Sequence, residues 1–117
     1  MSGVYYEPTS FLKKTTATEL FRELTNAVQY ENEDPHDFLL RCMDLQQKIT
    51  FASKEMDTFD YSDWLINKIF RRTLLTGFKS EQMRMEINSI LVDGIANEIL
   101  IQKLIALNQR IKERNVN

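Results

Sequence analysis

The sequence is poor in the residues that build disulfides, metal sites and tight turns. Its 117 residues include one Cys, one His, two Pro and three Gly. A single cysteine cannot form an internal disulfide, and one Cys with one His cannot supply the ligand set of a structural zinc site. So few Gly and Pro residues argue against an all-β protein with many tight turns and favour helices.

Long hydrophobic runs and an excess of positive charge are also missing. No apolar stretch approaches the roughly 20 residues of a membrane-spanning helix. The first ten residues, MSGVYYEPTS, lack the basic and apolar segments of a signal peptide. The formal net charge of -2 argues against a dedicated nucleic-acid binder, whose surface is usually basic. We therefore expect a cytoplasmic protein that does not bind membranes.

Length and composition indicate one helical domain with a core of its own. Hydrophobic residues make up 43% of the chain and charged residues 27%, which is ordinary globular usage. Apolar residues at helical spacing predict an all-α fold, a compact bundle of about five helices within residues 16–114. Residues 1–15 are predicted to be an N-terminal arm or inter-domain linker, and residues 115–117 a frayed tail.

Two capping patterns mark the first two helices. Thr16 and Glu19 have the spacing of a capping box, and the apolar residues after them predict a helix that ends near Gln29. Asp34 followed by Pro35 predicts the start of a second helix, which continues to about residue 52. The expected buried residues are Leu20, Phe21, Leu24 and Val28 in the first helix, and Phe38, Cys42, Leu45, Ile49 and Ala52 in the second.

Three further helices are predicted in the second half of the chain. Asp60 is expected to cap a helix over residues 61–75, which ends at Gly77 because glycine tolerates left-handed backbone angles. A fourth helix is predicted to end at Gly94, and a fifth to cover residues 96–114. The expected buried residues are Ile66, Ile69, Phe70 and Thr73 in the third helix, Met83, Ile87, Ile90 and Leu91 in the fourth, and Leu100, Leu104, Leu107 and Ile111 in the fifth.

The fifth helix has a wide apolar face. Ile101 and Ile105 extend the face formed by its four buried residues. A wide face is more typical of a core helix than of an oligomer seam. The sequence leaves open whether this helix belongs to the core or to an assembly junction.

Sequence motifs of catalysis and cofactor binding do not occur. A Gly-rich phosphate loop, an HExxH or CxxC motif and a nucleophile elbow are all missing. Cys42 lies on the predicted buried stripe and has no evident base partner, so we expect a core residue and not a nucleophile. We expect no enzyme, no cofactor and no metal, although a deep pocket with convergent polar groups would revive a small enzyme or ligand carrier.

Trp64 departs from the predicted core face of the third helix. At helical spacing, Trp64 and Leu75 project to the other side, among Lys68 and Arg71. An exposed tryptophan is a typical anchor of protein interfaces. The alternative is that Trp64 packs under the N-terminal arm or against another helix.

One specific constellation is the pattern Q-x3-E-x4-F-x2-R, formed by Gln29, Glu33, Phe38 and Arg41. It spans a predicted turn and the first half of the second helix. Phe38 is expected to anchor the turn in the core, and Arg41 to reach back to the Glu33 carboxylate or the Gln29 amide. The alternative is an ordinary capped turn with a surface ion pair worth less than about 1 kcal/mol.

This spacing resembles the major homology region of retroviral and retrotransposon Gag capsid proteins. The wider stretch ELTNAVQYENEDPHDFLLRCMDLQQKI is similar to the Gag capsids of long-terminal-repeat retrotransposons and their domesticated relatives, such as neuronal Arc. The resemblance covers residues 17–112 and implies the fold of a capsid C-terminal domain. Two positions depart from the pattern: Tyr30 stands where the motif usually has Gly, and Asn32 where some retroviruses have an inositol-phosphate-binding Lys, so no such site is expected.

The resemblance also implies a structural role. In that family the polar residues of the motif form an internal network, which implies that Gln29, Glu33 and Arg41 stabilise the fold and matter for assembly. Phe38 corresponds to the buried aromatic residue of the motif. The helix after the motif helix usually makes a two-fold contact, and the stretch Asp63–Ile66 resembles the retroviral stretch that places a Trp there. The expected dimer interface comprises Trp64, Leu65, Lys68, Arg71 and Leu75.

The implied partners are further copies of the chain, in a homodimer and a capsid lattice. Nucleic acid would be bound only by neighbouring domains of a longer polyprotein, and the location would be the cytoplasm and a virion or virus-like particle. The alternative is a host helical dimerisation module of the SCAN type, derived from a capsid domain.

Overall fold

Every element that the structure describes is a helix. The structure, a computed structural model, describes residues 16–55 and 61–116. The predicted arm 1–15, Asp60 and Asn117 lie outside these residues. The described elements are α1 (Ala17–Thr25), α2 (Pro35–Glu55), α3 (Asp63–Gly77), α4 (Glu81–Glu86), the 3-10 helix η2 (Ile87–Ile90) and α5 (Asn97–Val116). The prediction of an all-α fold with five α-helices is confirmed.

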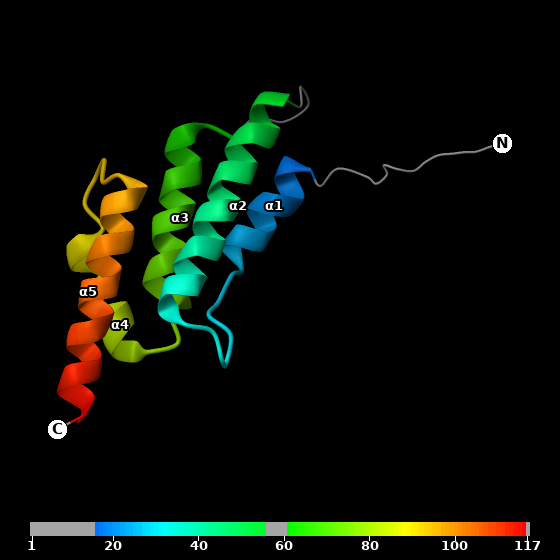
Figure 1. The fold of residues 1–117 in the computed structure, drawn as a ribbon. Coiled ribbons are helices and arrows are strands. Elements are labelled where there is room, and N and C mark those ends of the chain that lie inside the picture. Colours follow the sequence, from blue (N-terminus) through cyan, green and yellow to red (C-terminus); the bar gives the residue numbers. More distant parts are fainter. Residues whose placement is uncertain (1–15, 56–60, 117) are drawn as a thin grey trace.

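The helix α2 is the centre of the fold. It packs against α1 and α3, which also pack against each other. The helix α5 packs against α2, α4 and η2, whereas its backbone makes no close contact with the backbone of α1 or α3. Figure 1 shows the resulting arrangement, with α1 and α5 at opposite sides of the bundle. In the described part of the chain, no helix has both the length and the apolar content needed to cross a bilayer.

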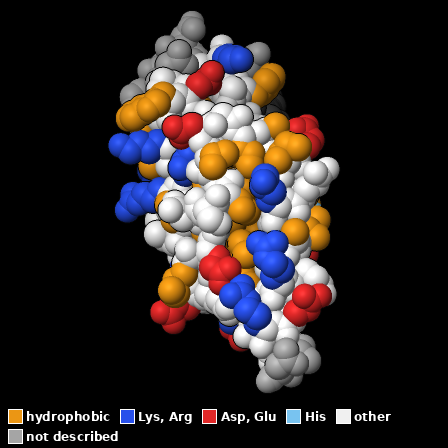
Figure 2. All heavy atoms as spheres, turned by 90° about the vertical axis from the view of Figure 1, so that its left-hand side faces the viewer, with side chains coloured by type: hydrophobic (Ala, Val, Ile, Leu, Met, Phe, Trp, Pro, Cys, Tyr) orange, Lys and Arg blue, Asp and Glu red, His pale blue; other side chains and the backbone are white. Residues whose placement is uncertain are grey.

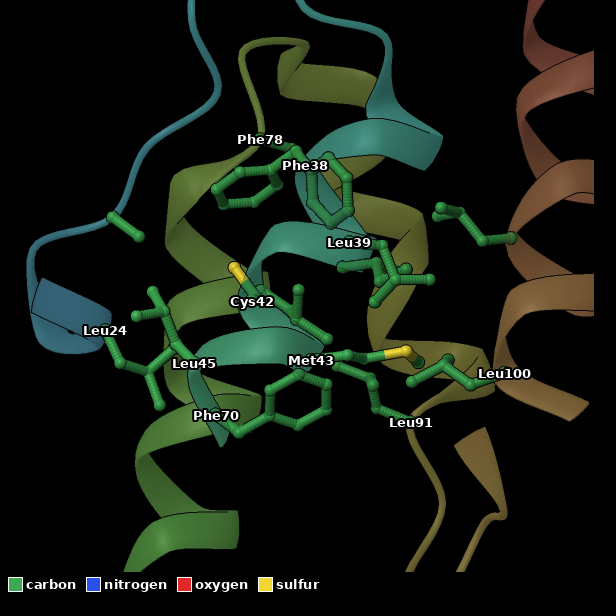
Figure 3. Close-up of a cluster of buried hydrophobic side chains, with 14 of the residues drawn as sticks. Leu24, Phe38, Leu39, Cys42, Met43, Leu45, Phe70, Phe78, Leu91 and Leu100 are labelled. Atoms are coloured by element: carbon green, nitrogen blue, oxygen red, sulfur yellow. The ribbon is translucent and has the colours of Figure 1, made fainter. Parts of the chain in front are cut away.

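The core is built around α2 because neighbours cover this helix on several sides. The predicted stripe is confirmed at four of its five positions, while Ala52 is only partly buried. Leu39 and Met43, which the predicted stripe did not include, are also buried. In Figure 3, Met43 points toward Leu91 and Leu100, on the side of α2 that α5 covers. The full set of buried α2 residues is Phe38, Leu39, Cys42, Met43, Leu45, Ile49 and Ser53.

The structure corrects the predicted end of the first helix. The helix α1 ends at Thr25, with Asn26 as its C-cap, and not near Gln29. The chain leaves the helix so that the backbone N–H of Gln29 can donate to the Gly77 carbonyl at 2.8 Å. Val28, which was expected to be buried, is therefore exposed. Phe21, also expected in the core, is only partly buried and stacks on Tyr61 at 4.3 Å between ring centroids.

Three other helix ends differ from the prediction: the start of α3, the end of α4 and the end of α5. Ser62 is the N-cap of α3, and its hydroxyl accepts a hydrogen bond from the Leu65 N–H at 3.2 Å. The fourth helix becomes the 3-10 helix η2 after Glu86 and does not continue to Gly94. The helix α5 continues through most of the predicted frayed tail, because Arg114 donates to Glu86 at 2.9 and 3.0 Å and ties the last turns to α4.

The buried seams of the last three helices are largely confirmed. All four predicted residues of α5 are buried, whereas Ile69 in α3 and Ile90 in η2 are only partly buried. Leu74, which is not among the residues predicted to be buried in the third helix, is fully buried. Ile105 does not join the core, since half of its surface is exposed (50%).

The predicted reason for a glycine at position 77, at the end of α3, is wrong. Among the described residues, the only glycine with a positive φ is Gly94, at 77°. A Cβ on Gly77 would lie 2.6 Å from Cζ of Phe38 and 2.8 Å from the carbonyl oxygen of Ala27. Gly77 is therefore required by close packing and not by backbone angles.

Candidate functional site

Glu33 and Arg41 form an ion pair with two hydrogen bonds across the α1–α2 loop. The Arg41 guanidinium donates from Nε to Glu33 Oε2 at 2.9 Å and from Nη2 to Oε1 at 2.8 Å. Nη2 also donates to the Val28 carbonyl at 2.6 Å, and the Tyr30 N–H donates to Glu33 Oε1 at 3.0 Å. Two-bond contacts of this kind fix orientation as well as distance. We call the Glu33–Arg41 pair the loop clasp.

Aromatic rings surround the loop clasp. The Arg41 Cζ atom lies 4.1 Å from the ring centroid of Tyr30 and 5.4 Å from that of Phe38. Phe38 is fully buried and meets Phe78 edge to face at 5.0 Å (Figure 3). The Tyr30 ring supplies a cation–π contact to Arg41.

Gln29 ties the loop to the junction between α3 and α4. Its Nε2 donates to the Glu33 carbonyl at 2.6 Å, and its Oε1 accepts from the backbone N–H of Lys79 at 2.8 Å. The Lys79 ammonium also lies 3.0 Å from the Glu31 carboxylate. Of the two partners expected for Arg41, the structure shows Glu33 and not the Gln29 amide.

The loop clasp changes the pKa of both of its members. Hydrogen bonding from Arg41 lowers the pKa of the Glu33 carboxyl below its usual value, against an opposing effect of burial. The same contact raises the pKa of Arg41. Because the folded pKa of Glu33 is lowered, its contribution to stability is complete above the unfolded value of about 4.3 and is lost as the pH falls through the folded value.

Replacing Arg41 with alanine is expected to lower the free energy of unfolding at pH 7 by about 1–3 kcal/mol, because Glu33 and the Val28 carbonyl lose their donor. The difference from the parent should shrink as the pH falls below the unfolded value of about 4.3 and through the lowered folded pKa of Glu33. Urea unfolding followed by circular dichroism at pH 7 and at acidic pH measures the effect.

The exposed ion pair between Lys48 and Asp44 provides a matched control on the same helix. Lys48→Ala should change stability by less than about 1 kcal/mol at either pH. An Arg41→Ala chain no less stable at pH 7 than the Lys48→Ala chain would show that the loop clasp does not stabilise the fold.

Cys42 lies in the core beside Arg41 and does not form a reactive site. The side chain is fully buried, and burial raises the pKa of its thiol to about 12. The thiolate, which is the reactive form of cysteine, is therefore scarce at neutral pH. This agrees with the expected role of Cys42 as a core residue.

The five residues of the predicted dimer interface share the outer side of α3, and we call them the α3 stripe. Trp64 is the most exposed hydrophobic member (68%), and the Lys68 ammonium lies 4.9 Å from its ring centroid. Arg71 is held by Asp93 at 2.8 Å, and Leu75 packs partly against the core. Leu65 is half-buried. The accessible part of the α3 stripe is therefore centred on Trp64 and Lys68.

A shallow groove of about 470 Å³ lies beside Trp64. Phe70, Leu91 and Leu100 contribute buried side chains to it, and Gln46 contributes an amide that donates to Asn67 Oδ1 at 2.8 Å. The sequence analysis missed this groove. Its lining comes from α2, α3, α5 and the loop before α5, and no local pattern brings these segments together.

Comparison with known proteins does not supply a family. No family model, curated protein or solved structure matches this chain. Within residues 16–55 and 61–116, no group of three or more His, Cys, Asp or Glu residues could hold a metal ion. The function is therefore inferred from the motif and from the geometry described above.

Proposed function

We propose that the chain is a structural domain like the capsid C-terminal domain of Gag, and that it self-associates through the α3 stripe to build a protein shell. The observation that carries this proposal is the exposure of Trp64 on a helix whose opposite side is firmly packed. Ile66 and Thr73 bury that opposite side in the core. The loop clasp, in the position that the Gag motif predicts, supports the same proposal.

A single helix face is sufficient for such a contact. A two-fold interface is self-complementary, so the α3 stripe of one copy can pack on the same stripe of another. Tryptophan contributes a large apolar area with few rotatable bonds and is a frequent interface hot spot. The contact between two isolated copies can be weak, because many simultaneous contacts in a shell multiply modest affinities.

Replacing Trp64 with alanine is expected to raise the dimer dissociation constant at least tenfold, because the anchor of the interface is lost. Sedimentation equilibrium over a concentration series measures the constant, and circular dichroism checks that helix content is unchanged.

Phe51 offers a matched control, because it is an aromatic residue on α2 that is exposed to a similar extent (65%) and lies off the α3 stripe. The Phe51→Ala chain should associate like the parent. If Trp64→Ala leaves the dissociation constant unchanged, the α3 stripe is not the interface.

A further inference from the structure

A second stripe of residues runs along a flank of α5, beside its buried seam. Its members recur at alternating spacings of three and four residues, so they share one side of the helix. Ile105 is half-exposed at its middle, Ile101 and Asn108 are partly buried, and the two ends are exposed. We call this set the α5 stripe; it comprises Glu98, Ile101, Ile105, Asn108 and Lys112. Figure 2 views the side of the molecule where α5 lies and shows hydrophobic side chains gathered there between charged ones.

The two ends of the α5 stripe carry opposite charges. Glu98 and Lys112 each lie seven residues from Ile105, or about 10 Å along the helix axis. In the described part of the chain, neither side chain has an ion-pair partner. An apolar centre with an unpaired acid at one end and an unpaired base at the other is complementary to its own reversed copy.

We propose that the α5 stripe binds the α5 stripe of a second copy in antiparallel orientation, about a two-fold axis at Ile105. Ile105 then packs on the partner's Ile105, Glu98 faces the partner's Lys112, and the same pair forms again on the other side of the axis. A parallel arrangement would place like charges opposite each other at both ends. The charge order of the α5 stripe therefore selects the antiparallel pair.

This second contact is distinct from the α3 stripe, because the two stripes lie on different helices and share no residue. A two-fold contact alone closes into a dimer, so a chain that builds a shell needs another contact on a different surface. The need for a second contact rests on the proposed function, whereas the argument from the charges at the two ends of the α5 stripe does not depend on it. A stripe of five side chains is small compared with the roughly 1,200–2,000 Å² of a stable interface, so the contact is weak in an isolated pair.

Cysteine cross-linking tests the contact in the full chain. The Ile105→Cys chain should form a disulfide-linked dimer at least tenfold faster than the Lys103→Cys chain under mild oxidation. Lys103 is also exposed but lies on another side of α5. The native Cys42 does not compete, because it is buried and its pKa is raised. Equal rates of cross-linking for the two chains would overturn the proposal.

Charge reversal tests the orientation. In the Ile105→Cys chain, Glu98→Lys should slow cross-linking at least threefold, because Lys then faces the partner's Lys112 twice. Adding Lys112→Glu should restore the rate, and failure to restore it would overturn the antiparallel pairing.

The two self-contacts are distinguished in a Trp64→Ala background. There the Ile105→Cys chain should cross-link at an unchanged rate, even though Trp64→Ala weakens association in solution. Loss of cross-linking in that background would show that the α5 contact depends on the α3 stripe and is not a contact of its own. If Trp64→Ala leaves association unchanged and cross-linking persists, the proposed function fails and the α5 contact stands.

Discussion

Replacing Phe38 with alanine is expected to lower the free energy of unfolding by about 3–5 kcal/mol, which is the usual range for truncating a buried aromatic residue. The ring is fully buried, lies edge to face with Phe78 and sits below the Arg41 guanidinium. Its removal leaves a cavity where α2 meets the end of α3, and the rigid helix ends around it cannot collapse to fill the space. Urea unfolding followed by circular dichroism measures the change.

The exposed residue Phe51 is again the matched control, because it lies on the same helix as Phe38. Phe51→Ala should change the free energy of unfolding by no more than about 0.5 kcal/mol, as expected for a surface position. Similar losses for the two variants would mean that Phe38 does not anchor the loop in the core.

Replacing Gly77 with alanine is expected to cost about 2–3 kcal/mol, because the added methyl group overpacks a closed contact. Helix propensity alone predicts the opposite sign, since alanine favours a helix by about 1 kcal/mol over glycine. The new Cβ would lie 2.8 Å from the Ala27 carbonyl oxygen, which belongs to the backbone and cannot rotate away. The loop must therefore shift away from α3, and the hydrogen bond from Gln29 to Gly77 weakens with it. Thermal and urea unfolding both measure the loss.

Gly94 is the control for glycine replacement. It has a φ of 77° but nothing within 4 Å of an added Cβ, so Gly94→Ala should cost only the strain of a left-handed backbone, about 1–2 kcal/mol. In a chain that already carries Phe38→Ala, the cost of Gly77→Ala should fall, because part of the clash is removed. A Gly77→Ala chain as stable as the parent would contradict the close packing.

The features that the sequence predicts well are those made by neighbours in the chain. The capping box of Thr16 and Glu19 forms as predicted, with both hydrogen bonds at 3.1 Å. The loop clasp joins residues only eight positions apart, and the exposure of Trp64 follows from helical spacing alone. Each of these depends on local geometry that a short stretch of sequence determines.

The features that the sequence does not predict are made by distant segments. Gly77 has the sequence context of a helix C-cap, yet its role depends on Phe38 and Ala27, which approach it only in the folded chain. The first helix stops early because Gln29 is needed at the α3–α4 junction. Local helix propensity cannot predict the packing around Gly77 or the hydrogen bond of Gln29, because tertiary contacts override propensity at both positions.

The contacts of Gln29 set an order in which a growing chain can acquire this structure. Glu33 and Arg41 are separated by eight residues, so they are synthesised close together in time. Gln29 can bind Lys79 only after fifty further residues have been added. Since synthesis runs from the N-terminus, the loop clasp can close while α3 is still being made, but the loop is fastened only afterwards. A nascent chain arrested before Lys79 would therefore carry a closed clasp on an unfastened loop, and a protease should cut that loop more readily than in the completed chain.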